Sequence, residues 1–105
     1  EELSRYEGFL SKEVWVNANV PGEVHTLLIW KTMEDWKSIP LDKLKEIDQR
    51  FIATFGSPFR IVRRIHKENN HGLYKVRMTV KADKDESDRF CRVAQSQGAY
   101  HGVGR

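Results

Sequence analysis

Three tryptophans and a few polar side chains are the residues of this sequence best suited to bind a small molecule. An indole ring can stack on a flat ligand, and an imidazole, hydroxyl or amide group can orient a polar atom of that ligand. The candidates for such a pocket are Trp15, Trp30, Trp36, His25 and Tyr74, with Asn17 and Asn19 as further polar residues. Large aromatic side chains on strands more often pack in a core or an interface, and we favour that interpretation.

The histidines and the cysteine do not have the spacing of a metal site or of an activated nucleophile. No second ligand stands two residues from His25, and His66 and His71 flank a polar connector, so we expect no metal; His101 is the fourth histidine. Cys91 is the only cysteine, which excludes an intrachain disulfide and predicts a buried, inert thiol. The sequence identifies neither a cofactor nor a catalytic residue.

Basic residues gather on two stretches that we expect to be strands. The proposed basic patch consists of Arg60, Arg64, Lys75 and Arg77, with Arg63, His66, Lys67 and Lys81 nearby. Such a face suits an acidic protein partner or phosphate groups. The alternative, a solvated strand face whose lysines prevent edge-to-edge aggregation, stays open. Interleaved exposed aromatic residues are missing, so we expect no nucleic-acid binding.

Composition predicts one soluble globular domain over residues 1–105. The chain is 39% hydrophobic and 31% charged, with a net charge of +3. Its longest apolar run, Leu27 to Trp30, is far shorter than the roughly 18 residues of a membrane span. The sequence opens on two glutamates rather than on the basic and apolar start of a signal peptide. A chain this short encloses a small core, so we expect a homodimer.

Hydrophobic periodicity predicts four strands and two principal helices. We expect strands over residues 9–17, 23–31, 59–65 and 73–80, a short helix capped by Thr32, and longer helices over 41–55 and 83–97. Residues 98–105 form a glycine-rich tail, and residues 1–6 resemble the end of a helix. Four strands with two helices predict an α+β domain in which helices cover one face of an antiparallel sheet.

The same patterns predict which side chains face the core. Period-two alternation places Leu10, Val14 and Val16 on one face of the first strand, and Phe59, Ile61 and Ile65 on one face of the third. The second strand is apolar on both faces and is therefore expected to be central and covered on both sides. The stripe expected to bury the 41–55 helix consists of Leu41, Leu44, Ile47, Phe51, Ile52 and Phe55.

The order of several short motifs resembles a known family. Tyr6 to Asn17, with its Gly-Phe step, is followed by a Pro-Gly-Glu turn, a strand ending in Trp30, and the run Trp36 to Pro40. Over about residues 3–65 this resembles small cyanobacterial and plastid proteins related to the antibiotic biosynthesis monooxygenase superfamily. The resemblance implies a ferredoxin-like sheet, a dimeric α+β barrel with a pocket between sheet and helices, and a cytoplasmic or plastid stromal protein of a photosynthetic organism.

One departure from that family suggests a circular permutation. The family has a strand and a helix before the segment that resembles it, whereas here a strand and a helix follow it, at residues 73–97. Two functions stay open: a monooxygenase-like or otherwise aromatic-binding small-molecule site, and a non-enzymatic interaction or assembly module that docks an acidic partner. Fold alone does not decide between them.

Overall fold

A four-stranded antiparallel sheet with helices on one face forms the fold, as expected. The structure is a computed structural model that describes residues 5–68 and 72–97. The elements in chain order are β1 (Phe9–Val16), β2 (Glu23–Trp30), α1 (Met33–Lys37), α2 (Leu41–Phe55), β3 (Phe59–Glu68), β4 (Tyr74–Ala82), a single 3₁₀ turn (Lys84–Glu86) and α3 (Ser87–Gln97). The expected tail at 98–105, the first four residues of the expected helical end, His71 and His101 lie outside the described residues.

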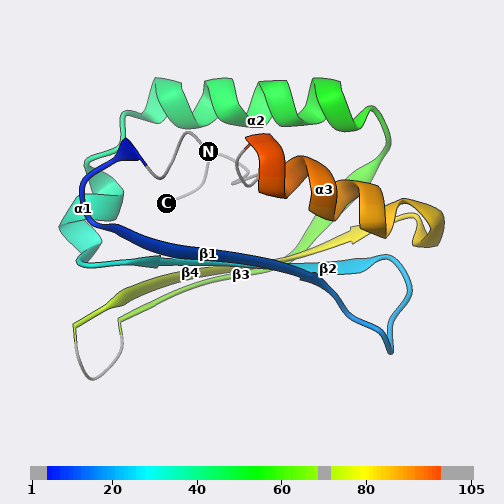
Figure 1. Cartoon of the computed structure of the whole chain (residues 1–105), viewed down its shortest axis with the longest axis horizontal. Helices are drawn as coiled ribbons and strands as arrows, with labels where there is room; N and C mark the ends of the chain where they lie inside the picture. Colours follow the sequence, from blue (N-terminus) through cyan, green and yellow to red (C-terminus); the bar gives the residue numbers. More distant parts are fainter. Residues whose placement is uncertain (1–4, 69–71, 98–105) are drawn as a thin grey trace.

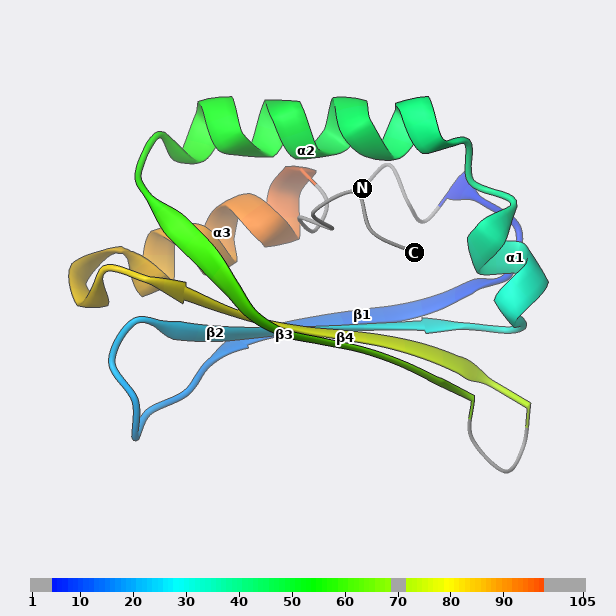
Figure 2. The same ribbon diagram turned by 180° about the vertical axis from the view of Figure 1, so that it is seen from behind.

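The sheet has the strand order β1-β2-β4-β3, and every neighbouring pair is antiparallel. The expected 73–80 strand therefore pairs in the same sheet as the other three, which confirms that part of the prediction. Figures 1 and 2 show α2 and α3 above one face of the sheet, and no described element covers the other face. We call the first the helix face and the second the open face.

Local sequence signals explain where the helices begin and end. Thr32 caps α1 by accepting a hydrogen bond from the Asp35 backbone N–H at 3.0 Å, as its position predicted. Gly56 closes α2 in the left-handed conformation with φ of 70°, which glycine adopts without a Cβ penalty. Residues 83–97, which were predicted to form one helix, instead form a 3₁₀ turn followed by α3. A 3₁₀ turn is wound more tightly than an α-helix and is frequent at helix N-termini.

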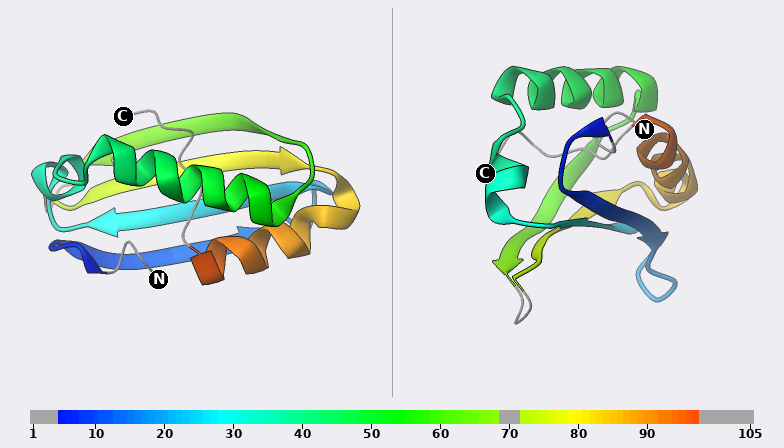
Figure 3. Two further views of the ribbon diagram at one scale, coloured as in Figure 1. Left: turned by 90° about the horizontal axis from the view of Figure 1, so that it is seen from above. Right: turned by 60° about the vertical axis from the view of Figure 1, so that its left-hand side comes forward.

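The core fills the space between the helix face and the two longer helices. Seen from above in the left view of Figure 3, α2 and α3 lie over the sheet at a tilt to its strands, with α3 over the β1 side. Phe51 and Phe90 meet there with ring centroids 4.7 Å apart, and both are fully buried. Val93 and Ala94 of α3 also face this core, as does Cys91, a free buried thiol whose pKa is raised by burial and by Asp88.

Two β-bulges correct the predicted strand faces. An irregularity between Phe9 and Ser11 leaves Leu10 51% exposed, so it does not share the core face of Val14 and Val16. A second irregularity between Ile61 and Arg63 moves Ile65 to the open face, although Ile61 packs on the core. Each bulge adds one residue to its strand and thereby reverses the alternation of the residues beyond it.

Two further expectations about burial were wrong. Leu41 and Ile52 are about half exposed, because the sheet covers a narrower stripe of α2 than the apolar pattern spans. Strand β2 is central, as predicted, yet Leu27 and Ile29 on its open face are only half-buried because no described element lies against them. The open face is thus partly apolar and unpartnered within the described part of the chain.

Candidate functional site

Aromatic rings gather on the helix face at the end of the sheet next to α1. The Trp30 and Trp36 ring centroids are 5.5 Å apart, and Trp36 lies 6.1 Å from the imidazole of His66. Both indoles are completely buried. Phe9 packs edge-on against Trp30, with ring centroids 5.4 Å apart. Tyr74 packs edge-on against His66, with ring centroids 5.8 Å apart. We call these five residues the aromatic cluster.

His66 and Tyr74 form a hydrogen-bonded pair inside this cluster. The His66 Nδ1 atom is 2.8 Å from the Tyr74 hydroxyl oxygen. Burial, with the positive charges of Arg64 and Lys37, lowers the pKa of His66, so the neutral imidazole is favoured. Burial also raises the pKa of Tyr74, which keeps the phenol protonated. The pair therefore joins a neutral imidazole to a neutral hydroxyl.

In the described part of the chain, Trp30 Nε1 and His66 Nε2 are buried nitrogen atoms of the aromatic cluster without a hydrogen-bond partner. Buried polar atoms are nearly always satisfied, and leaving one unsatisfied costs about 1–3 kcal/mol. Two such atoms in one ring cluster are the strongest sign of a ligand site on the helix face.

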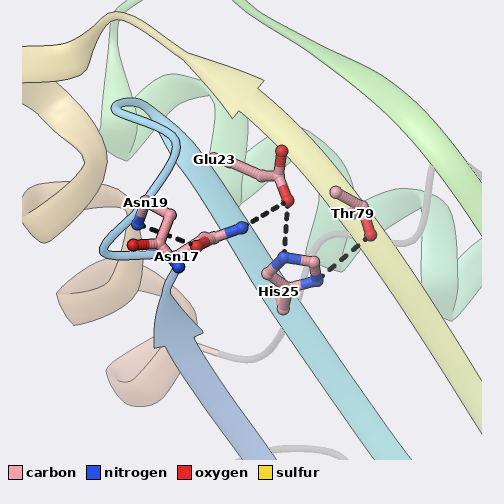
Figure 4. A network of polar contacts seen from close by, with 5 residues as sticks. All are labelled: Asn17, Asn19, Glu23, His25 and Thr79. Carbon is pink, nitrogen blue, oxygen red and sulfur yellow. Dashed lines mark hydrogen bonds and ion pairs between the residues drawn. The ribbon is translucent and has the colours of Figure 1, made fainter.

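A second group of side chains is ordered on the open face. The imidazole of His25 stacks on the Trp15 indole with centroids 5.3 Å apart and planes 12° from parallel. His25 Nε2 lies 2.7 Å from a Glu23 carboxylate oxygen, and Nδ1 lies 3.2 Å from the Thr79 hydroxyl (Figure 4). Asn17 donates to the same carboxylate at 3.1 Å, and this bond is the main cause that lowers the pKa of Glu23. Both ring nitrogens of His25 are thus held.

The hydroxyl, imidazole and carboxylate of this network do not form a catalytic triad. Such a triad needs an accessible nucleophile beside backbone N–H groups that can stabilise an oxyanion. Thr79 is 7% exposed and lies mid-strand, with β4 paired to β2 on one side and β3 on the other. The network instead fixes the orientation of Trp15, which is 39% exposed.

The open face also has a shallow cleft beside Trp15. Its volume is about 350 Å³, and Trp15, Leu27, Ile65, Lys67, Lys75 and Arg77 line it. The Arg77 guanidinium carbon lies 5.9 Å from the Trp15 ring centroid, within reach of a cation–π interaction. Apolar walls with a basic rim suit a partner that presents both apolar and acidic groups.

The structure separates the five predicted pocket residues into two groups. Trp30, Trp36 and Tyr74 lie in the aromatic cluster, whereas Trp15 and His25 lie on the open face, and the sheet stands between the two groups. The proposed basic patch is divided in the same way. Arg60, Lys75 and Arg77 lie on the open face, but Arg64 pairs with Met78 and shares its helix face, because the bulge before Arg63 reverses the alternation.

Sequence reasoning missed three residues of these groups. His66 was considered only as a metal ligand or as part of the basic cluster, although its register opposite Val76 places it on the helix face. Glu23 and Thr79 were not among the predicted site residues. The polar alternation of β4 could have placed Thr79 on the open face. The distance between Thr79 and His25, however, depends on the strand order.

No group of three or more metal-ligating side chains occurs within residues 5–68 and 72–97. None of the helices formed by these residues has the length and apolar character needed to cross a membrane. No family model, curated protein or solved structure matches this chain. The geometry described above therefore carries the functional argument.

Proposed function

We propose that this domain binds a flat aromatic molecule at the aromatic cluster, as the subunit of a dimeric α+β barrel of monooxygenase-like type. The observation that carries the proposal is the pair of unsatisfied buried nitrogens, Trp30 Nε1 and His66 Nε2. Both belong to rings that pack against Trp36, and we propose one ligand that meets both. A ligand that supplies an acceptor would remove the cost of leaving them unsatisfied.

Proton placement defines the ligand chemistry. With the imidazole neutral and the phenol protonated, we assign the Tyr74 hydroxyl as donor to His66 Nδ1, which places the imidazole proton on Nε2. The indole Nε1 of Trp30 is always a donor. Two donors without acceptors suit a ligand with a carbonyl, phenolate or carboxylate oxygen, and the surrounding rings suit its aromatic plane.

Access to the cluster is part of the proposal. Trp30 and Trp36 are fully buried, and Trp36 is carried by α1, a helix of only five residues. We therefore expect α1 to move when the ligand enters, and we expect association well below the diffusion limit.

Strand order supports the proposed relationship to the ferredoxin-like family. In a chain with the order β-α-β-β-α-β, moving the first strand and helix to the end gives the element order of this protein, if α1 is set aside. The sheet order β1-β2-β4-β3 is the one that this permutation produces. The Lys12 ammonium donates to the Ala94 carbonyl at 2.7 Å, so the start of β1 lies beside the last turn of α3.

A second function, docking of an acidic partner, is favoured by one observation. The cleft on the open face combines the apolar side chains of Trp15, Leu27 and Ile65 with the charged ends of Lys67, Lys75 and Arg77. Charges of one sign around an apolar centre steer and orient a partner of opposite charge. This function needs no ligand at the aromatic cluster and can be tested separately.

Calorimetry with a matched pair of probes tests the ligand proposal. 1-Indanone has an aromatic ring and a carbonyl acceptor, and indane has nearly the same shape without the acceptor. One hydrogen bond contributes about 0.5–1.5 kcal/mol, so 1-indanone should bind about twofold to tenfold more tightly. Trp30→Phe keeps a ring but loses the donor and should reduce that preference, whereas Trp15→Phe should not. Equal affinities for the two probes, or no binding of either, would contradict the proposal.

A further inference from the structure

Charge is divided between the two halves of the open face. Cross-strand register assigns Glu13 and Glu23 to this face on β1 and β2. The same register places its basic residues only on β4 and β3: Arg60, Arg63, Lys67, Lys75, Arg77 and Lys81. The boundary between the acidic and basic halves therefore runs between β2 and β4, which are neighbours in the middle of the sheet.

We infer that the open face binds a second copy of this chain around a two-fold axis that runs along the strands near the β2–β4 boundary. This inference rests on the homodimer included in the proposed function and specifies its geometry. Rotation about such an axis places the β1–β2 half of one copy over the β4–β3 half of the other. Acidic residues then face basic ones twice, since a two-fold interface repeats each contact.

Other arrangements of two sheets are disfavoured by the same charges. A two-fold axis across the strands would place the basic half of one copy over the basic half of the other, and like charges brought together in an interface oppose association. Face-to-face pairing along the strands is the arrangement that opposes each half to its complement. The charge pattern thus selects one orientation as well as one partner.

The centre of the open face has the composition of an interface core. Trp15 and Ile65 are 39% and 38% exposed, and Leu27 lies between their strands on β2. The stacked His25 ring holds Trp15 in one orientation, so little side-chain entropy is lost when a partner covers it. Buried aromatic anchors inside a polar rim are typical of protein–protein interfaces.

Two opposite charge reversals test this geometry. Glu13 and Arg77 are exposed residues on the acidic and basic halves, and both lie in the cross-strand row of Leu27. In Glu13→Lys, a lysine of the β1–β2 half faces the basic half of the partner copy, and in Arg77→Glu a glutamate of the β4–β3 half faces the acidic half. Each variant alone should dimerise at least about tenfold more weakly than the unchanged chain, measured by sedimentation equilibrium. An equimolar mixture should form a heterodimer with near-original affinity.

Lys45→Glu is the matched control, because Lys45 is an exposed residue of α2 on the far side of the helix layer. Lys45→Glu replaces a positive charge with a negative one, as Arg77→Glu does, and should leave dimerisation unchanged. Circular dichroism shows whether each variant stays folded, and rescue in the mixture cannot arise from misfolded chains.

The outcomes separate this inference from the homodimer itself. A mass near 12.3 kDa for the unchanged chain at about 100 μM would overturn both. A dimer that neither reversal weakens, or two weakened variants that do not rescue each other, would overturn the charge-directed geometry alone. Binding of a separate acidic protein by a monomeric chain would assign the open face to the docking function instead.

Discussion

The imidazole of His25 lies almost parallel to the indole of Trp15, with ring centroids 5.3 Å apart and an angle of 12° between the planes. Glu23 and Thr79 hold the imidazole at its two nitrogens, so the indole lies on a fixed support. An exposed tryptophan held in one orientation is characteristic of a binding surface. The same network explains why the open face presents Trp15 without burying it.

Replacing Trp15 should affect association much more than folding. Trp15→Ala should weaken dimerisation at least about tenfold in sedimentation equilibrium, because it removes the aromatic anchor of the proposed interface. The matched change Trp30→Ala removes a fully buried ring and should lower the free energy of unfolding by about 3–5 kcal/mol. If Trp15→Ala destabilised the monomer as much as Trp30→Ala, Trp15 would be a core residue.

Stability should fall on acidification because of His66. Burial lowers the pKa of this imidazole in the folded protein, whereas the unfolded chain protonates it near its ordinary value of about 6.5. Below that pH the unfolded state binds more protons, so the free energy of unfolding decreases until the pH reaches the folded pKa. Urea unfolding between about pH 7.5 and about pH 5.5 should show this loss.

His66→Gln provides the control for the acid effect, since glutamine does not titrate. The variant should have a flatter stability profile over the same pH window. Glu23, whose pKa is lowered from 4.5, contributes stability that is lost only at lower pH and does not overlap strongly with that window. An equally steep profile in His66→Gln would show that another group causes the loss.

The prediction from sequence was good where one pattern decides one element. The bounds of α2 matched the predicted 41–55 helix, because the apolar stripe, Pro40 before it and Gly56 after it agree. The same stripe overestimated burial, and Leu41 and Ile52 remain half exposed. Periodicity identifies the apolar side of a helix, but the width of the neighbouring sheet decides how much of that side is covered.

Side-chain faces beyond a bulge could not be predicted from alternation. Ile65 was expected beside Ile61, and the irregularity before Arg63 places it on the opposite face. The sequence there contains no glycine or proline to mark the extra residue. The same error assigned Arg64 to the basic patch and left the helix-face position of His66 unrecognised.

Two adjacent positions on α2 should respond very differently to truncation. Phe51→Ala should lower the free energy of unfolding by about 3–5 kcal/mol, because Phe51 is fully buried and packs against Phe55 and Phe90. Ile52→Ala should cost much less, since Ile52 is 49% exposed. Chemical unfolding of both variants checks the orientation of α2, and a larger effect at Ile52 would mean that the helix is rotated.

The β1–β2 turn should be sensitive to a single methyl group at Gly22. Its φ is +85°, and an added Cβ would lie 2.3 Å from the carbonyl oxygen of Ala82, whose N–H donates to the Gly22 carbonyl. Gly22→Ala therefore combines backbone strain with a clash against the end of β4. Gly56→Ala also has positive φ but meets no atom closer than 3.9 Å, so thermal melts should show the smaller loss there. Equal losses at both positions would contradict the close approach of the turn to β4.

The indole N–H resonances in a ¹H–¹⁵N correlation spectrum test the aromatic site most directly. Trp30 Nε1–H should shift when 1-indanone is added, because it gains an acceptor that it lacks among the described residues. The Trp15 N–H, on the opposite face of the sheet, should not shift in the same titration, and indane should leave the Trp30 signal nearly in place. A Trp30 resonance that is unchanged by 1-indanone, or that moves equally with indane, would contradict an acceptor-binding site at the aromatic cluster.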